Sequence, residues 1–441
     1  MRREYQLDAR KTSLNWVGFM SQRPPPLDRG PTMSSTCDVL VIGAGPGGGS
    51  AALHSARLGL NVIIAEDHAE IGTPVHCGEC LSSLAVENLE LDLPEHVIAL
   101  RCKGIRVIFP DSGSRLLTEP GYVLEKHLFE RWLINQAVDA GAELRLSHKV
   151  KSIEKQFNSE NKFSNWKIDG IGEAFPIEAK VILDASGVHA LCAKLLKMED
   201  EVEVISGFQY EMHEVENDGY LDFYLWPKYS PHGYVWMIPK KEGRANVGLV
   251  TTDKKGAIRY LDAFVEDSYL KANPKVNPPW RNQSVKIKPF GGTIPISGPR
   301  QETYDDGLML IGDAAGFTSP LFEGGSHLAL KSGMFAAQVS AKAISEGDTS
   351  KVKLKTYQDI WEKEFPPYDK ILKGKTALYE LSEEELSFVG RCLPKEMSSM
   401  GPLTKLGVGL KILFRKPLLY SRKVISVLLS FGYSRAKHHG W

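Results

Sequence analysis

The spacing of apolar residues near the start of the chain predicts alternating strands and a helix. An apolar run at Asp38–Ile42 leads into a glycine-rich turn, a helical stretch at Ser50–Leu58 and a second apolar run at Asn61–Ala65. Continuous apolar runs of about four to eight residues are typical of strands that are buried on both faces of a parallel sheet. This order of elements therefore predicts a βαβ unit.

The middle of the chain changes to the two-residue period of an antiparallel sheet. Leu221, Phe223 and Leu225 alternate with Asp222, Tyr224 and Trp226. Such alternation places every second side chain on the same face of a strand. Further strands are expected at Glu143–Ser147, Lys149–Ile153, Trp166–Ile168 and Ile177–Leu183, and a helix is expected at Leu128–Gly141.

These patterns predict the α/β class, with a Rossmann-like domain interrupted by a mostly antiparallel substrate sheet and followed by helices. The residues before the first strand are rich in proline and show no apolar period, which is typical of a disordered extension. The expected parts are an extension at 1–36, a discontinuous dinucleotide-binding domain at 37–100, 119–200 and 289–350, a substrate domain at 101–118 and 201–288, and a helical region at 351–441.

The glycine-rich turn carries a dinucleotide-binding motif in its full context of strand, turn, helix and second strand. Gly43 allows the tight turn, Gly45 lets the backbone approach a pyrophosphate, and Gly48 lets helix and strand pack closely. Glu66 follows the second strand, 23 residues after Gly43, and can accept hydrogen bonds from both ribose hydroxyls. It would repel a 2′-phosphate, which argues against NADP at this site.

A second set of glycines and carboxylates favours FAD over NAD, because a ribityl chain and a flavin ring extend beyond the first motif. The helix dipole after Gly324-Gly325 would stabilise negative charge on a reduced flavin, and Asp313 would hold the ribityl hydroxyls. The cofactor-binding residues predicted beyond the first motif are Asp184, Gly187, Gly312, Asp313, Gly324 and Gly325.

The composition excludes further classes of function. The chain has 441 residues with 54 Lys plus Arg and 54 Asp plus Glu, so a broadly basic face for nucleic acid is not expected. No apolar run approaches the roughly 18 residues of a spanning helix. Six cysteines at uneven spacing form no disulfide framework, which favours the cytoplasm.

The charge balance is uneven along the chain. Residues 401–441 carry a net charge of +8 without any acidic residue, so the first 400 residues carry −8. The tail also holds apolar clusters. It could be a helical cap whose basic face meets water, or an interfacial helix on an anionic membrane, at roughly 1 kcal/mol per basic residue. We expect a cytoplasmic protein with peripheral membrane contact through this tail.

Three longer segments resemble the geranylgeranyl reductase family of flavoproteins, which has the p-hydroxybenzoate-hydroxylase-like fold. The segment Glu70–Glu79 is similar to the family's Gly-x-Pro-Val-x-Cys-Gly-Glu pattern. Gly233–Lys240, continuing into Ala245–Leu249, is similar to its Tyr-x-Trp-x-Phe-Pro-Lys pattern, and Gly307–Gly325 is the third match. The resemblance spans residues 37–346.

The chain departs from the family pattern at Ile238, where the family has Phe, and at Cys80, where Gly is usual. Lys126 stands where such flavoproteins usually place Arg; it can neutralise a phosphate but not bind it in a bidentate manner. The Tyr-x-Trp-x-Ile-Pro stretch is also similar to a motif of flavin-dependent halogenases, but their catalytic lysine segment has no convincing counterpart.

The resemblance implies reduction of isoprenoid double bonds in a geranylgeranyl chain, on a lipid or a diphosphate, by hydride from reduced FAD. It places Cys77 near the flavin and substrate, where it donates a proton or shapes the site. With Cys80 it could instead form a redox dithiol or half a zinc site, but a second ligand pair is missing and no metal is expected. The predicted site residues are Cys77, Tyr234 and Trp236 for catalysis and Phe208, Tyr210 and Phe223 for the substrate.

Two other functions remain open at this point. One is an aromatic monooxygenase or halogenase of the same fold, in which oxygen reacts with the reduced flavin. The other is a membrane-associated flavoprotein that passes electrons to quinone. No second dinucleotide motif identifies the electron donor, so ferredoxin, NADPH and other carriers all remain candidates.

Overall fold

The computed structural model describes residues 35–75, 77–198, 202–213, 215–266, 285–417 and 424–439. The predicted extension at 1–36 lies outside the described residues, apart from Ser35 and Thr36, which begin the first strand. His76, in the Glu70–Glu79 motif, and residues 418–423, in the basic tail, also lie outside them.

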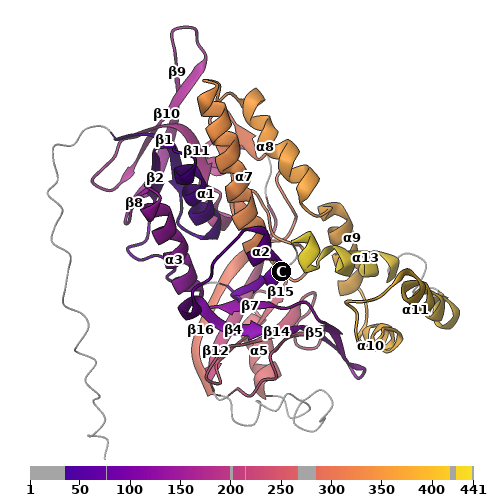
Figure 1. Ribbon diagram of the computed structural model, residues 1–441. Coiled ribbons are helices and arrows are strands. Elements are labelled where there is room, and N and C mark those ends of the chain that lie inside the picture. Colours follow the sequence, from indigo (N-terminus) through magenta and orange to yellow (C-terminus); the bar gives the residue numbers. More distant parts are fainter. Residues whose placement is uncertain are drawn as a thin grey trace, which may run out of the picture. The chain divides into compact units, whose positions relative to one another are not determined.

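The first sheet has a parallel core in the order β8-β2-β1-β11-β18, with antiparallel β17 at its edge. Val39, Leu40 and Val41 of β1 have no exposed surface, as their apolar run predicts. A hairpin, β9–β10, pairs with the first half of β11 and projects from the sheet (Figure 1). The strands are β1 Ser35–Ile42, β2 Val62–Ala65, β8 Glu143–Arg145, β9 Lys149–Phe157, β10 Phe163–Ile171, β11 Ile177–Asp184, β17 Tyr304–Asp305 and β18 Leu308–Leu310.

The helices α1 (Pro46–Arg57), α7 (Ser326–Ser345) and α8 (Lys351–Glu364) pack on this sheet, and α3 (Lys126–Asp139) packs on α1. Glycines let α1 and α7 lie very close together, because a Cβ at Gly333 would collide with the Gly47 carbonyl oxygen. Ser50 Oγ also donates a hydrogen bond to the Leu330 carbonyl at 2.6 Å. The start of α7 is thereby held against the start of α1.

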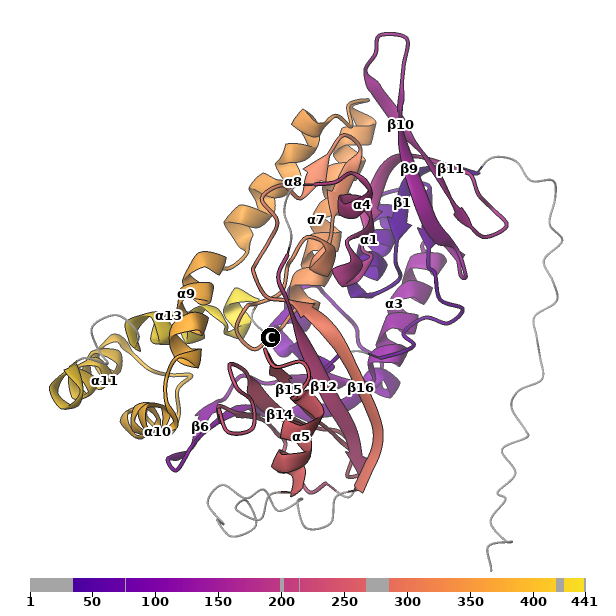
Figure 2. The ribbon, with the colours of Figure 1, turned by 180° about the vertical axis from the view of Figure 1, so that it is seen from behind.

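The second sheet has seven strands in the order β16-β12-β15-β14-β13-β5-β6. Its pairs are antiparallel except β13–β5, where Tyr220–Tyr224 runs parallel to Gly104–Ile108. The helix α5 (Ala257–Glu266) covers one face (Figure 2). The strands are β5 Gly104–Phe109, β6 Gly113–Leu117, β12 Val204–His213, β13 Tyr220–Tyr224, β14 Tyr234–Pro239, β15 Ala245–Thr251 and β16 Val285–Pro295.

Smaller elements complete the fold. A three-stranded sheet has the order β3-β7-β4, with β3 Cys80–Ser82, β7 Gly121–Leu124 and β4 Ile98–Cys102. Short helices are α2 Ser83–Asn88, η1 Glu95–Val97, η2 Gly187–His189, α4 Leu191–Leu195 and η4 Gly312–Ala314. The C-terminal helices are α8 Lys351–Glu364, α9 Tyr368–Tyr379, α10 Glu383–Cys392, α11 Pro402–Arg415, α13 Ile425–Tyr433 and η6 Ala436–His438.

The predicted class, a Rossmann-like α/β domain with an inserted antiparallel sheet and C-terminal helices, is confirmed. The boundaries differ modestly: the expected strand at Trp166–Ile168 is the centre of the longer β10, and the expected helix at Leu128–Gly141 begins and ends two residues earlier. Among the described residues, no helix is both long enough and apolar enough to cross a bilayer.

Candidate functional site

A cleft of about 750 Å³ lies at the carboxyl ends of β1 and β2, where the first βα turn meets the loop after β11. Its shape depends on glycines. A Cβ at Gly43, which has φ +96°, would collide with the Ala185 carbonyl, and a Cβ at Gly48 would collide with the Gly43 carbonyl. A Cβ at Gly45 would meet no protein atom within 4 Å. Gly45 therefore faces open space, while Gly43 and Gly48 permit close packing.

Glu66 lies at the end of β2 and lines the cleft. Its Oε2 accepts a hydrogen bond from the Ala44 backbone N–H at 2.7 Å, and its Oε1 accepts one from the His68 N–H at 3.0 Å. Oε1 is also in contact with His68 Nδ1 at 2.5 Å, so the remaining acceptor capacity is the second lone pair of Oε2. Glu66 thus fixes the glycine turn and still borders the space where a ribose would lie.

Asp184 is the last residue of β11 and Gly187 begins η2, and only Gly187 lines the cleft. The Asp184 carboxylate has no exposed surface and accepts hydrogen bonds from the N–H groups of Ser186, at 3.0 Å, and Cys192, at 2.8 Å. Burial raises its pKa. Asp184 therefore stabilises the loop that follows β11 through hydrogen bonds from its backbone N–H groups.

The second set of predicted cofactor-binding residues, Gly312, Asp313, Gly324 and Gly325, lies where η4 and the start of α7 meet. Asp313 Oδ1 accepts a hydrogen bond from Thr318 Oγ1 at 2.9 Å, and burial raises its pKa although nearby Lys126 lowers it. Gly312 has φ +56°, and Gly325 is the N-cap residue of α7. A Cβ at Gly325 would lie 3.4 Å from Asp313 Oδ1, so the two predicted cofactor residues are adjacent.

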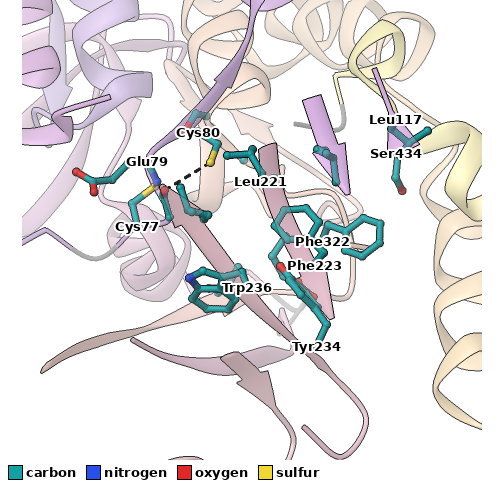
Figure 3. A pocket seen from close by; sticks show the side chains of 18 of the residues that line it. Cys77, Glu79, Cys80, Leu117, Leu221, Phe223, Tyr234, Trp236, Phe322 and Ser434 are labelled. Atoms are coloured by element: carbon teal, nitrogen blue, oxygen red, sulfur yellow. Dashed lines mark hydrogen bonds between the residues drawn. The ribbon is translucent and has the colours of Figure 1, made fainter. Parts of the chain in front are cut away.

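A second, mostly apolar cavity of about 110 Å³ lies between the seven-stranded sheet, the Gly324–Gly325 turn and the C-terminal helices (Figure 3). Four residues predicted for catalysis or substrate binding line it, namely Cys77, Phe223, Tyr234 and Trp236, together with Gly324 and Gly325, which were predicted to bind the cofactor. Other lining residues, which were not predicted as site residues from the sequence, are Leu117, Leu221, Phe322, Glu323, Phe431 and Ser434.

Gln209 connects two of the predicted residues. Trp236 Nε1 donates a hydrogen bond to Gln209 Oε1 at 2.9 Å, and Gln209 Nε2 donates one to the Cys77 carbonyl at 2.9 Å. The side chain is 3% exposed. Gln209 is thus a functional candidate that the sequence reasoning missed, although a polar residue alternating with Phe208 and Tyr210 in a strand was a usable signal.

Phe208 and Tyr210 are not brought into the cavity. Both pack on the cluster beneath α5, with their rings in an edge contact at 5.4 Å. Tyr210 donates a hydrogen bond to Asp262 on α5 at 2.9 Å. Phe208 also borders a separate small hollow beside Cys77. The two-residue period separates these rings from Gln209, which points the other way.

Glu79 connects the Glu70–Glu79 segment to the Gly233–Leu249 segment and to Lys126. Its carboxylate is 2% exposed, and its backbone has φ +71°. Oε1 accepts from the Lys126 N–H at 3.0 Å, and Oε2 accepts from Asn246 Nδ2 at 2.6 Å and pairs with Lys240 Nζ at 2.5 Å. Lys240 also pairs with Glu125. The Cys-Gly-Glu loop is thereby tied to β14, β15 and the start of α3.

Lys126 lies beneath this loop. Its Nζ pairs with Glu130 at 3.1 Å. Burial opposes its charge, yet its pKa is raised because Cys77, Glu130 and Glu79 surround it. The two thiols differ: the Glu79 N–H donates to Cys77 Sγ at 3.2 Å, while Cys80 Sγ donates to the Gly78 carbonyl at 3.5 Å and burial raises its pKa. Neither cysteine is in a disulfide.

Two family models match the chain. One is described as the geranylgeranyl reductase catalytic domain and matches residues 203–277; the other is described as lycopene cyclase protein and matches residues 38–224. The second match covers most of the cleft. The first covers β12 to β15, including the strands that carry Gln209, Phe223, Tyr234 and Trp236.

Among solved structures, a geranylgeranyl bacteriochlorophyll reductase-like protein from Thermoplasma acidophilum aligns with a TM-score of 0.75 and 29% identity, covering 87% of this chain and 98% of that chain. The flavin-dependent brominase Bmp2 aligns with a TM-score of 0.66 and 18% identity, covering 91% of this chain and 100% of that chain. At 18% identity the second likeness shows the fold alone, which is shared with flavin-dependent halogenases.

Curated relatives extend along nearly the whole chain. Digeranylgeranylglycerophospholipid reductase 2 of Methanopyrus kandleri is 33% identical over 394 residues, which cover 87% of this chain and 97% of the relative. Digeranylgeranylglycerophospholipid reductase of Methanocaldococcus jannaschii is 34% identical over 379 residues, 83% of this chain and 93% of the relative. The resemblance noted in the sequence is confirmed, and the chain belongs to the geranylgeranyl reductase family.

Proposed function

We propose that the protein reduces carbon–carbon double bonds in the geranylgeranyl chains of a lipid, with hydride from reduced FAD. This proposal rests on one short segment that contributes residues to both the cleft and the apolar cavity. Gly72–Pro74 line the cleft, and Cys77–Cys80 line the apolar cavity. A dinucleotide in the cleft and an isoprenoid chain in the cavity would therefore meet along a few residues.

The residues of the cleft fit FAD. The start of α1 offers backbone N–H groups that suit a pyrophosphate, and the open space at Gly45 leaves room for it. Glu66 would accept hydrogen bonds from the adenosine ribose. Gly324 and Gly325 would lie against the flavin, with Asp313 beside them.

Bound FAD would supply hydride to the alkene. The protein's own part is to bind and orient the chain and to exclude water. The rings of Phe223, Tyr234 and Trp236 offer an apolar wall, and burial at about 0.8 kcal/mol per methylene supplies most of the affinity for a long chain. Gln209 fixes the Trp236 ring and the Cys77 backbone, so the wall is positioned before a chain enters.

Reduction of a lipid under anaerobic conditions tests this function. The purified flavoprotein is photoreduced, mixed with a geranylgeranyl lipid and examined by mass spectrometry. We expect one added hydrogen pair per reduced bond, in step with flavin reoxidation. Reoxidised flavin with an unchanged lipid mass contradicts the proposal. Oxygen uptake with substrate hydroxylation or halogenation would indicate a monooxygenase or halogenase. Electron transfer to quinone without any change in the lipid would indicate a membrane-associated flavoprotein that passes electrons to quinone.

The same assay identifies the electron donor. Reduced ferredoxin and NADPH are supplied in turn in place of light, and the donor is the one that restores lipid reduction over many turnovers.

We also propose that α11 brings the protein to a membrane that contains its lipid substrate. Val408 and Ile412 are buried and attach this helix to the protein. The opposite face exposes Leu403, Leu406, Leu410 and Phe414, of which Leu403 is 84% and Phe414 is 81% exposed. Exposed Lys405, Lys411 and Arg415 flank them. Exposed apolar side chains among basic ones suit an anionic lipid surface.

Substitution of Leu403 and Phe414 by serine tests this contact better than removal of the tail, because α13 contributes Phe431 to the cavity wall. We expect the double variant to lose most of its binding to phosphatidylglycerol-containing liposomes in a sedimentation assay while it keeps its flavin spectrum. Unchanged liposome binding would mean that α11 is not the contact. Matched serine substitution of exposed Val352 on α8 serves as the control.

A further inference from the structure

Three carboxylates border the apolar cavity, and they differ in how their oxygens are occupied. Both oxygens of Glu79 accept hydrogen bonds, as described above. Glu119 pairs with Arg435 Nε at 2.6 Å and accepts from the Ala436 N–H at 3.2 Å. Glu323 Oε1 pairs with Lys375 Nζ at 3.1 Å, whereas its buried Oε2 accepts no well-formed hydrogen bond among the described residues, and the Tyr234 side chain is the donor that lies beside the carboxyl.

The position of Glu323 is fixed by its neighbours. The residue directly precedes the Gly324–Gly325 turn, and its side chain is 2% exposed. Phe322 and Glu323 both have left-handed backbone, with φ of +67° and +48°, a conformation that costs a non-glycine residue about 1 kcal/mol or more. The Phe322 ring stacks on Phe223 at 5.2 Å and meets Tyr234 edge-on at 5.3 Å, which holds this conformation in place.

Lys375 reaches Glu323 from another part of the chain. It is a buried residue of α9 with its side chain 9% exposed. A buried cation beside a carboxyl group favours the negative form of that group, so Lys375 would stabilise Glu323 after the loss of a proton. The pair thus places a carboxyl group that lines the cavity beside a buried positive charge.

We propose that Glu323 is the acid that delivers a proton to the substrate alkene; this rests on the proposed reductase function. The π bond breaks, one carbon accepts hydride from reduced FAD, and the other forms a C–H bond with the proton from the Glu323 carboxyl. The alkene gains one hydride and one proton. The carboxylate that remains is paired with Lys375, and a proton from solvent restores the acid.

The electrostatic surroundings agree with this role. Burial raises the pKa of Glu323, although Lys375 and Tyr234 act in the opposite direction. A raised pKa keeps the carboxyl protonated to a higher pH, so the rate of reduction falls as the pH rises through that pKa. Tyr234 is a weaker candidate because burial and Glu323 hold its pKa well above the usual value. The titratable groups that interact with Glu323 are Tyr234 on β14 and Lys375 and Tyr379 on α9. Cys77, Glu79, Cys80 and Glu119 line the same cavity.

Single-turnover kinetics of the FAD-loaded, full-length protein test the proposal. Glu323→Gln should slow reoxidation of the photoreduced flavin by geranylgeranyl lipid by roughly 10²- to 10⁴-fold, while lipid binding to the oxidised protein changes less than about threefold. Glu323→Asp, which keeps the carboxyl, should recover part of the rate and retain its pH dependence. Asp369→Asn, on the exposed side of α9, is the matched control and should react like the parent protein.

A rate in Glu323→Gln within about threefold of the parent would overturn the proposal. Infrared difference spectra of the lipid-bound, oxidised protein provide a readout that does not depend on turnover. We expect the band of a protonated carboxyl at neutral pH in the parent and its absence in Glu323→Gln. If the Glu323 carboxyl is ionised throughout, it is not the acid. If the parent leaves the lipid unreduced although this band is present, the reductase function fails instead.

Discussion

The cleft and the apolar cavity are built from different parts of the chain. The cleft is formed mainly by backbone at the ends of parallel strands, where Gly43, Gly45 and Gly48 lie within six residues of one another. The cavity is formed by side chains from distant segments, such as Cys77, Trp236 and Phe431. A binding surface made of backbone depends on close packing, whereas one made of side chains depends on long-range contacts that fix each of them.

The largest expected effect concerns close packing in the cleft. Gly48→Ala would force a Cβ against the Gly43 carbonyl, and two backbone segments cannot yield as a flexible side chain can. We expect the free energy of unfolding to fall by more than about 4 kcal/mol, with loss of FAD. Gly45→Ala, which meets no protein atom, should unfold like the parent when both lack cofactor. Denaturant unfolding measures both; equal stability of the two variants would contradict the role of packing.

The next effect concerns the long-range contacts behind the cavity. Lys240→Met would leave Glu79 and Glu125 without their shared cation, and the Lys240 side chain is only 5% exposed. We expect a loss of about 3 kcal/mol of unfolding free energy. The neighbouring Lys241 pairs with exposed Glu95, so Lys241→Met should cost less than about 1 kcal/mol. Similar losses from both variants would show that the buried network is not what holds the loop.

Acid should weaken the region where α7 begins. His327 and His439 stack at 4.4 Å; burial lowers the pKa of His327 to about 3 and that of His439 to about 4. Both are neutral in the folded protein but take up protons near pH 6.5 when unfolded, so the stability they contribute above pH 6.5 is lost as the pH falls. Between pH 7 and 5, His327→Leu should lose about 2 kcal/mol less than the parent in urea unfolding. Parallel losses would exclude His327 as a source.

The smallest effect concerns one bond in the cavity wall. Trp236→Phe removes the donor to Gln209 Oε1 and should cost about 1 kcal/mol. It should also weaken chain binding, measured by titration of the oxidised protein with lipid. Trp226→Phe alters a ring on the opposite face of the sheet and should leave chain binding unchanged. Equal binding by both variants would mean that Gln209 does not position the wall.

The sequence predicted more of the residues that line the cleft than of those that line the cavity. The strands that end just before Gly43 and Glu66 are predicted by local apolar runs. The glycine-rich turn after the first strand matches a known motif, so its structure is predicted locally as well. Asp184 ends a strand, as the sequence predicts, but the inward direction of its carboxylate depends on amides of the following loop. Glu323 and Gln209 acquire their partners from segments far away in sequence, Lys375 and Trp236, and no local pattern records such contacts.

The strand order of the first sheet has a consequence for synthesis on the ribosome. β11 ends at Asp184, but its partner β18 begins only at Leu308, and α7, which packs on α1, ends at Ser345. Until those residues leave the exit tunnel, the apolar second half of β11 has an unpaired edge, because β10 pairs only with its first half. Such edges promote aggregation. Nascent chains arrested between β11 and β18 should therefore depend on chaperones most strongly, and release near residue 345 should end that dependence.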